Sequence, residues 1–500
     1  MNNEDLRALV SAQHQDALTA TNASKLSKAR SDASSYYNGD MSTDMPAQPG
    51  RSTAVSMDVS DTIEGMMPQL MEIFAGSDEV VKFDPVGPDD VDAAQQETDY
   101  INHVFMNQNP GFLVLYSFIK DALLSKVGVV KVWWETEETE HKETYLDKTD
   151  DEFALISSDP DVEVVEHTAH PADQPDDDEE NDTDDGYEKR PRNEIHPINK
   201  LAVSLGMPVP MLHDVTVVTK RKHAQARVLG VPPEEFGIER GARNIKDCNY
   251  CFHKVVDRTV AQLIAQGYDA DQCRKLPTYR SITGAEEIAR DTVDENSNAG
   301  YDAENEASRY VEITEHYIRM DYEGNGKPCL YRVVTGGTEG ELLKLDGKPD
   351  VQDWDEIPFA AVTPVIVTHR FWGRSIADLV MDIQRIKTAL LRGLLDNQYL
   401  VNNPRIEVSA SHASDSTLED LLVVRPNSIV RTAQPGGLNQ LEITPIGQTV
   451  YPALDYMDAT REWRTGVTKA GQGIDANALQ NQSATAVNQV FSASQARIQL

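Results

Sequence analysis

The stretch of sequence that decides the fold is residues 371–405, FWGRSIADLVMDIQRIKTALLRGLLDNQYLVNNPR. Apolar residues recur at helical spacing from Ser375 to Leu400 and predict an amphipathic helix. Ser375 is placed to cap its first turn, and the sequence NNPR at 402–405 ends it. At ~1.5 Å per residue this helix spans about 40 Å. The apolar side consists of Ile376, Leu379, Val380, Ile383, Ile386, Leu390, Leu394 and Leu395.

A small segment rich in turns follows this helix, and a second helix is predicted from about Thr449 to Arg464. Residues 468–483 are rich in Gly, Asn and Gln without periodicity, which predicts a flexible polar loop. A third helix is predicted from Ala484 to Leu500. The short elements predicted between the first two helices are strands at 406–408, 428–431 and 441–443, and a helix around 418–422.

The residues before this stretch alternate between helical and strand patterns, so we predict the α+β class. Residues 3–39 predict a helical arm at the N-terminus. The other predicted helices are 55–75, 89–106, 111–126 and 259–266. The predicted strands are 80–85, 127–134, 215–218 and 250–256, with a hairpin of 311–320 and 330–334 around a turn at 323–326.

The chain is strongly acidic, with 46 Lys and Arg against 82 Asp and Glu and a formal net charge of −36. This balance argues against an ordinary duplex-binding protein, which needs a basic surface to displace counterions from phosphates. It is compatible with a merely acidic soluble protein, or with a surface past which a polyanion moves without being gripped. The densest acidic run, 173–185, predicts a solvated or disordered insert and lacks the spacing of an EF-hand loop.

Motifs for catalysis and cofactors are weak or missing in the sequence. We find no phosphate-binding loop, nucleophile elbow, HExxH or paired CxxC, and we predict no cofactor, no metal and no enzymatic activity. Cys248 and Cys251 have the spacing of a metal or redox pair, with His253 nearby, but reduced, half-buried thiols in a strand are the better interpretation. The sequence shows neither a secretory signal nor an apolar stretch of ~18 residues, which a membrane span needs, so we expect cytosolic synthesis.

The order of helix, compact insert, returning helix, polar loop and helix resembles the core of phage portal proteins, in particular the short-tailed, Salmonella podovirus-type branch. The residues that carry the resemblance lie mainly at 373–375, 384–397 and 403–405, with weaker matches at 100–103, 118–123 and 128–134. It covers most of residues 50–500. Family members continue into further wing and crown segments, so we expect that this chain stops before the crown.

The resemblance implies a division of the chain into portal segments. It implies a wing at 1–370, which includes the N-terminal arm and an acidic insert at about 137–199. The implied segments that follow are a first stem helix at 371–401, a clip at 402–447, a second stem helix at 448–467, a tunnel loop at 468–483 and the start of a wing helix at 484–500.

The function that the resemblance implies is a homododecameric ring at the capsid vertex of the virion, assembled in the host cytoplasm. Double-stranded DNA passes through such a ring without sequence specificity during packaging and ejection. The implied protein partners are the terminase motor, the tail adaptor, the major capsid protein and the scaffold. No membrane is involved.

Basic residues in the implied channel are candidates for positioning DNA. They are Lys469 in the loop, Arg385, Lys387 and Arg392 on the first stem helix, and Arg405, Arg425 and Arg431 in the clip. For each one, a surface or intersubunit ion pair is the competing interpretation. The competing functions are another virion structural protein, such as a tail adaptor or scaffold, and more remotely a metal-dependent nuclease.

Overall fold

A computed structural model describes residues 1–23, 25–77, 79–159, 161–171, 211–279, 306–337, 340–409, 411, 414–423, 428–432 and 436–468. The chain divides into two compact units, Met1–Val132 with Val228–Leu500, and Trp133–Arg227. Both contain helices and strands, so the α+β prediction is confirmed.

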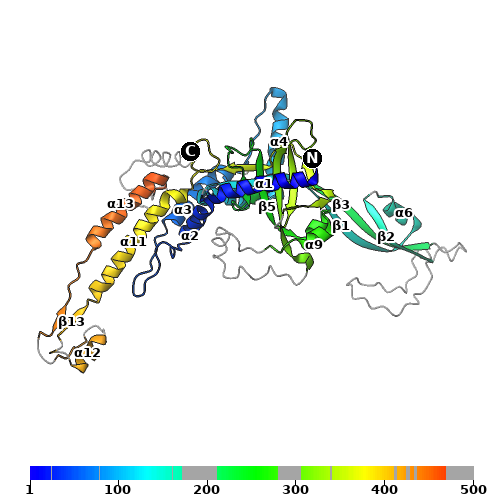
Figure 1. Cartoon of the computed structure of the whole chain (residues 1–500). Coiled ribbons are helices and arrows are strands. Elements are labelled where there is room, and N and C mark those ends of the chain that lie inside the picture. Colours follow the sequence, from blue (N-terminus) through cyan, green and yellow to red (C-terminus); the bar gives the residue numbers. More distant parts are fainter. Residues whose placement is uncertain are drawn as a thin grey trace. The chain divides into compact units, whose positions relative to one another are not determined.

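Helices form one part of the larger unit (Figure 1). The helices α2 (Leu26–Tyr37), α3 (Asp58–Ala75), α5 (Gly111–Ser125) and α11 (Ile376–Asn402) share one hydrophobic core. Ile63 of α3 and Val380 of α11 are fully buried in it. Because α11 contributes its first turns to this core, the start of the long helix is fixed to the rest of the unit.

A six-stranded antiparallel sheet forms the other part, in the order β11-β7-β6-β5-β4 with β8 beside β7. Strands β6 and β7 form the predicted hairpin, and the carboxylate of Asp321 accepts the amides of residues 324–326 in its turn. The strands are β4 (Phe236–Ile238), β5 (Tyr250–Thr259), β6 (Tyr310–Met320), β7 (Cys329–Gly336), β8 (Glu341–Leu342) and β11 (Val351–Asp353).

Helix α1 (Asn3–Ala23) packs on this sheet instead of extending as a separate arm. Leu6, Val10 and Ala17 are buried against sheet residues. Its His14 lies with Nδ1 3.3 Å from the Tyr250 hydroxyl, which also lies 2.8 Å from Nδ1 of buried His316. The helical character predicted for 3–39 is confirmed, but the range forms two helices, α1 and α2, which both pack into hydrophobic clusters.

Short elements pack against strands β5, β6 and β7 of the sheet. The predicted helix at 259–266 is α8 (Val260–Ala265), and α9 (Ala270–Lys275), which we did not predict, follows it. Both carry buried side chains into one small cluster, among them Leu263 and Cys273. The remaining elements here are η3 (Glu306–Ser308), β9 (Lys344–Leu345) and β10 (Lys348–Pro349).

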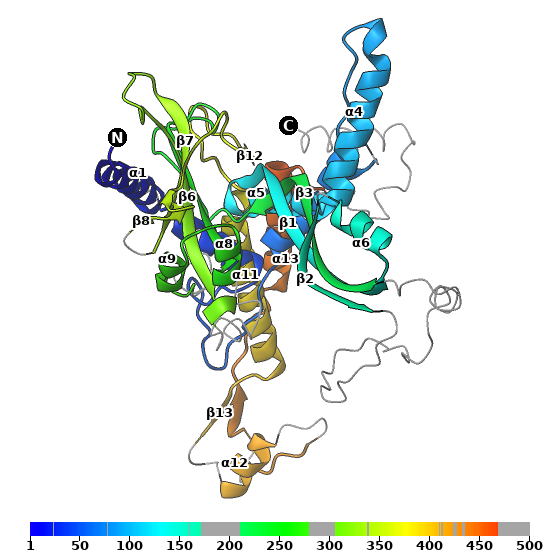
Figure 2. The same cartoon turned by 90° about the vertical axis from the view of Figure 1, so that its right-hand side faces the viewer.

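The predicted strand at 80–85 is wrong. These residues lie alongside α4 (Val91–His103) and have no partner strand in the described chain (Figure 2). The helix predicted at 89–106 is confirmed as α4, which is slightly shorter. The amides of Val80 and Val81 bond to the Asn102 side chain, so α4 takes the place that a strand would have. A 3-10 turn, η1 (Pro88–Asp90), precedes α4 and a π-helical turn, η2 (Val104–Gln108), follows it.

The smaller unit contains a twisted antiparallel sheet and one helix. Strand β1 (Gly128–Lys148) begins in the larger unit, where it pairs with β12 (Phe359–Val362), and then continues beside β3 (Met211–Val231). The other edge of β3 pairs with β2 (Val162–Pro171). We expected the acidic insert to begin at about 137, but β1 runs on to Lys148, and α6 (Asp150–Ser157) and β2 follow. The acidic run at 173–185 lies outside the described residues.

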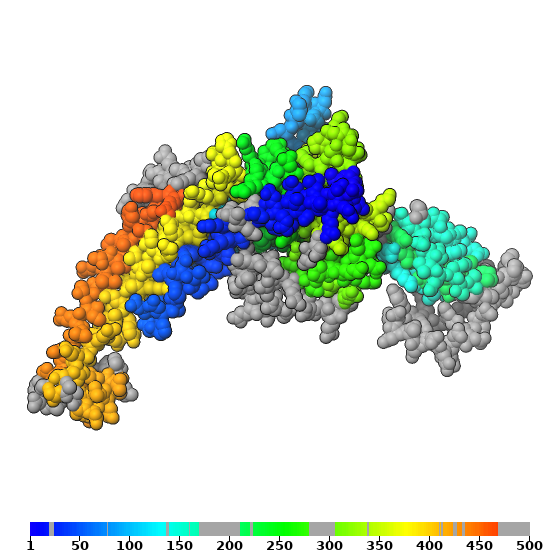
Figure 3. Space-filling model, in the orientation of Figure 1, coloured from blue at the N-terminus to red at the C-terminus, as the bar shows by residue number. Residues whose placement is uncertain are grey.

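Two antiparallel helices, α11 and α13 (Gly447–Thr465), are joined by a small module that lies beyond their far end (Figure 1). The module has a two-stranded sheet of β13 (Ile406–Val408) and β14 (Leu438–Gln440), and the helix α12 (Asp415–Leu422). The strands predicted at 428–431 and 441–443 are wrong: the first segment is held by Asp420, and the strand lies at 438–440. Figure 3 shows the two helices packed side by side.

Candidate functional site at the base of the paired helices

The N-terminus of α11 is fixed by the residue that the sequence predicts as its cap. The Ser375 hydroxyl accepts the amide of Asp378, and the Asp378 carboxylate accepts the amide of Ser375, each at 3.0 Å. Lys126 donates to the same carboxylate at 2.8 Å. Ser375 is fully buried, so this capping box sets the position at which the long helix leaves the core.

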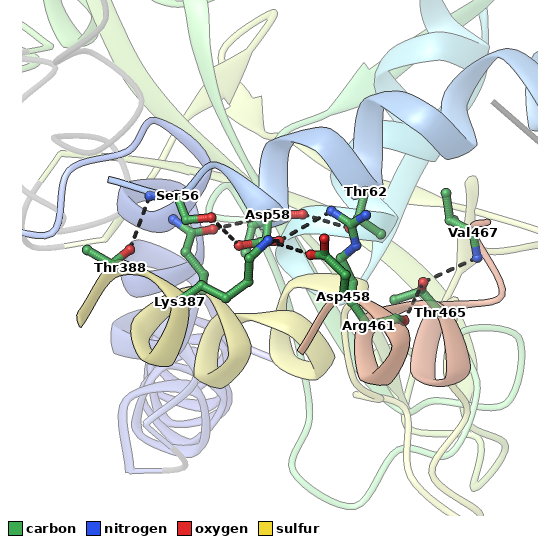
Figure 4. Close-up of polar contacts among 11 residues, drawn as sticks. Ser56, Asp58, Thr62, Lys387, Thr388, Asp458, Arg461, Thr465 and Val467 are labelled. Atoms are coloured by element: carbon green, nitrogen blue, oxygen red, sulfur yellow. Dashed lines mark hydrogen bonds and ion pairs between the residues drawn. The ribbon is translucent and has the colours of Figure 1, made fainter. Parts of the chain in front are cut away.

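Asp58 is the centre of a buried polar cluster that joins α3, α11 and α13 (Figure 4). Its carboxylate accepts hydrogen bonds from Lys387 Nζ at 2.6 Å, from Arg461 at 3.2 Å and from the Ser56 hydroxyl at 2.6 Å. Lys387 also donates to Asp458 at 2.7 Å. One carboxylate that is only 1% exposed thus binds a cation from each of the paired helices α11 and α13, and we call Asp58, Lys387, Asp458 and Arg461 the clamp. A buried charge is tolerated when it is paired and hydrogen-bonded in this way.

Two polar residues of α11 extend this clamp toward α2 and α3. The Gln384 side chain accepts the amide of Val59 at 2.9 Å and donates to the carbonyl of Tyr36 at 2.9 Å. Thr388 Oγ1 accepts the amide of Ser56 at 3.1 Å. Both are fully buried among apolar neighbours. They satisfy backbone groups at the start of α3, so they fix the register of α11 against it.

The electrostatics of the clamp affect its neighbours. Burial, and then the charge of Asp58, raise the pKa of Asp61 above its ordinary value. On the opposite side, Arg464 of α13 donates to the Asp382 carboxylate at 2.6 Å and to the carbonyl of Leu379 at 2.9 Å. Cations of α13 are therefore matched by acidic or carbonyl groups of α3 and α11.

The end of α13 determines where the following segment begins. Gly466 terminates the helix with φ +79°, a left-handed conformation that favours glycine. The Thr465 hydroxyl donates to the carbonyl of Arg461, and Val467, only 3% exposed, donates its amide to Thr465. The predicted loop at 468–483 starts at this fixed point. Lys469 and the predicted helix from Ala484 lie outside the described residues.

The structure gives different surroundings to the three basic candidates on α11. Lys387 is largely buried between Asp58 and Asp458. Arg392 donates to the carbonyls of Ala54 at 2.9 Å and Met45 at 2.8 Å, and so holds the chain before α3 against the helix. Arg385 is exposed and makes no side-chain hydrogen bond or ion pair with the described residues.

The basic candidates of the small module also differ. Arg431 forms a two-pronged ion pair with Asp420 at 2.8 and 2.9 Å, and it lowers the pKa of that carboxyl to about 2. Arg405 is exposed, and its carbonyl accepts the amide of Leu441. Arg425 lies outside the described residues. The competing ion-pair interpretation therefore describes Arg431 and Lys387, whereas Arg385 and Arg405 keep exposed side chains.

The two cysteines and the histidine considered as a metal or redox site, Cys248, Cys251 and His253, are buried in or next to β5. Cys248 precedes β5 and Cys251 lies within it; both are buried free thiols, and burial raises the pKa of Cys251. His253 faces Glu235 and Glu315 across 3.9 and 3.8 Å, and burial lowers its pKa. Within the described residues, no group of three or more His, Cys, Asp or Glu side chains is arranged to hold a metal ion.

Sequence reasoning missed the clamp. Asp58, Asp458 and Arg461 were not singled out, although an acidic residue at the first position of a helix was a usable signal. Gln384 was noted only within the stretch that carries the resemblance, and Lys387 only as a candidate for contact with DNA. Their partners lie more than 300 residues away, so no local pattern connects them.

Comparison with known proteins now complements this geometry. The family model described as "Phage SU10 portal protein" matches residues 6–500, which include the clamp and both paired helices. Among the curated proteins, none matches the chain. Within the described part of the chain, no helix combines the length and the apolar character needed to cross a membrane.

Proposed function

This chain belongs to the phage SU10 portal protein family and is a phage portal protein, and from that premise we propose that twelve copies close into a ring through which DNA is packaged and ejected. The prediction from sequence that this chain is a portal protein is thereby confirmed, and the proteins of this family are structural proteins. The observation that best supports the ring is the pair of antiparallel helices that Asp58 clamps at one end and a small module caps at the other.

The paired helices are suited to form the wall of a channel. We propose that α11 and α13 are the stem helices, that 402–447 is the clip and that 1–370 forms the wing. Several large apolar side chains of the two helices are exposed in the single chain and suit burial between copies. They are Ile386, Leu395, Tyr399, Tyr451, Tyr456 and Trp463. Repeated heterologous contacts of this kind close a ring when the rotation between neighbours divides the circle.

The charges of the stem support passage of DNA without tight binding. The two helices carry five cations, Arg385, Lys387, Arg392, Arg461 and Arg464. Three of them are paired with carboxylates and Arg392 is engaged by carbonyl groups, which leaves Arg385 exposed. Few free cations release few counterions from DNA, so a duplex slides instead of being held. We propose Arg385, Arg405 and Lys469 as the residues that meet phosphates.

The residues of the clamp touch no DNA in this proposal, but they hold α13 in place. It fixes the C-terminal end of α13 to the core, and the proposed tunnel loop starts immediately beyond Val467. Asp58, Lys387 and Arg461 are thus positioning residues for that loop. Terminase during packaging and the tail adaptor afterwards are the proposed partners of the clip, and the capsid protein and scaffold those of the wing.

Negative-stain imaging of the purified protein tests the proposal most directly. We expect rings with a central hole about as wide as a DNA duplex, and twelvefold symmetry in class averages. Particles without a hole, or a monomer at all concentrations, would contradict the ring. A second test is a Lys469→Ala or Arg385→Ala ring, with Arg431→Ala as the matched control: normal packaging and retention of DNA by the first two would contradict their role.

A further inference from the structure

The segment before α4 bends at Val80 and Val81 and then continues to Pro85 without a turn, and α4 bonds to one of its edges. Asn102 Oδ1 accepts the amides of Val80 at 2.9 Å and Val81 at 3.0 Å, and Asn102 Nδ2 donates to the carbonyl of Val81 at 2.7 Å. Thr98 Oγ1 accepts the amide of Phe83 at 3.0 Å. Both α4 side chains are buried. The amides of Val80 and Val81 share one oxygen, and from Val81 onward the bonds reach alternate residues, Val81 and Phe83, as those of a neighbouring strand would.

The opposite edge of the segment is free. In an extended chain the N–H and C=O groups of successive residues point to opposite edges, so Lys82 and Asp84 face away from α4 when Val81 and Phe83 face it. Within the described part of the chain the amides of Lys82 and Asp84 donate no hydrogen bond, and both residues are exposed. An extended edge of this kind is a template for another strand.

Large apolar side chains are exposed on this segment and on α4. Val81 and Phe83 are each 38% exposed, and Tyr100 and Ile101, on the turn of α4 that holds the segment, are 60% and 36% exposed. Exposed apolar groups that gather on one small element mark a protein interaction site. Lys82 and Pro85 keep the edge short, which limits unspecific pairing.

The charge of this element indicates what covers it. Residues 79–103 contain seven Asp and Glu against one Lys, so a neighbour with basic side chains is favoured. The chain itself carries such a surface, the turn between β4 and β5 with exposed Arg240, Arg243 and Lys246. An acidic edge and a basic turn on the same chain are complementary between two copies and form a heterologous contact.

We infer that the Lys82–Asp84 edge accepts an extended strand from a second copy of this chain, with the basic turn 240–246 of that copy against the acidic surface of α4. This inference rests on the proposed ring and names one of its contact surfaces. Main-chain hydrogen bonds hold the strand, Val81 and Phe83 receive its apolar side chains, and the charges set which face of the neighbour is used.

Hydrogen exchange of individual amides tests the inference without any substitution. Ring and monomer of the full chain are compared. We expect the amides of Lys82 and Asp84 to exchange at least ~10-fold more slowly in the ring, as for one added hydrogen bond, while those of Val81 and Phe83 are protected in both forms. Rings in which Lys82 and Asp84 exchange as fast as in the monomer would overturn the inference alone. Failure to form any ring would overturn the proposed function as well.

Substitutions of Lys82 separate the contribution of its backbone amide to assembly from that of its side chain. Lys82→Pro removes only an outward amide, and Lys82→Ala is the matched control that keeps it. We expect Lys82→Pro to raise the concentration for half-assembly up to ~10-fold and Lys82→Ala to change it little. Equal behaviour of the two variants contradicts the inference. If the amide of Val81 is no longer protected from exchange in the Lys82→Pro monomer, the proline has disturbed the contact with α4. Asp84→Pro is then the variant to use in place of Lys82→Pro.

The charge component has its own test. Arg243→Glu should weaken assembly, and the effect should shrink as salt is raised. Lys327→Glu, which makes the same change of charge at the β6–β7 turn outside residues 240–246, is the control. Assembly of Arg243→Glu that is indistinguishable from that control would show that the basic turn is not the facing surface.

Discussion

Replacement of Asp58 by Asn should loosen α13 far more than the small change in shape suggests. Asn keeps the volume and a hydrogen bond to Ser56, but it removes the charge that Lys387 and Arg461 share. Loss of one partner from a buried ion pair costs ~3–5 kcal/mol. Because Lys387 keeps Asp458 at 2.7 Å, we expect the lower end, about 3 kcal/mol, which corresponds to a change of ~150-fold in an equilibrium constant.

The assay is hydrogen exchange of the α13 amides, which reports the free energy of local opening without requiring two-state unfolding of a large chain. The matched control is Asp458→Asn. Asp458 is 22% exposed at its side chain and Lys387 would keep Asp58, so we expect a loss of only ~1 kcal/mol. The double variant Asp58→Asn/Lys387→Met should cost less than the sum of its parts, because no unpaired cation remains at position 387.

Two results would refute this reasoning. One is a folded Asp58→Asn protein whose α13 amides exchange within about threefold of the wild-type rate, well below the range for a broken buried pair. The other is an Asp458→Asn variant with an effect as large as that of Asp58→Asn. Either result would show that the apolar core alone holds the paired helices.

Three further predictions concern other parts of the larger unit. Ser375→Ala should lower the unfolding free energy by ~1 kcal/mol through loss of the capping box, and Ser375→Thr should restore most of it in thermal unfolding. Arg392→Lys should speed limited proteolysis within 42–54, because a lysine cannot reach the carbonyls of Met45 and Ala54 together; unchanged cleavage would contradict this. Burial lowers the pKa of His14 to about 4 and that of His316 to about 3, so below ~6.5 the unfolded state binds more protons than the folded state. Docking of α1 should be complete above that pH and weaken as pH falls toward 4 and below; α1 exchange that does not change with pH, after correction for intrinsic rates, would contradict it.

Local patterns in the sequence determined the elements whose causes are local. The helix from 376, its Ser375 cap, its end at Asn402 and the hairpin of β6 and β7 follow from periodicity, capping and turn chemistry, and the structure confirms each of them. The prediction of a strand at 80–85 was wrong because Asn102 and Thr98 of α4 accept backbone amides that a partner strand would otherwise bind. The division into wing, stem, clip and tunnel loop stays a prediction.

What the sequence by itself established is therefore the kind of element at most positions, the acidic charge and the resemblance to portal proteins. Only the tertiary structure decided which parts of those elements are buried. On the apolar side of α11, Ile376, Val380 and Ile383 are buried, but Ile386 and Leu395 are each 43% exposed, while polar Gln384 and Thr388 are fully buried. The reason is that α2 and α3 cover only the first turns of α11. Asp58 likewise acquires its role from Lys387 and Arg461, which the fold brings from 329 and 403 residues away.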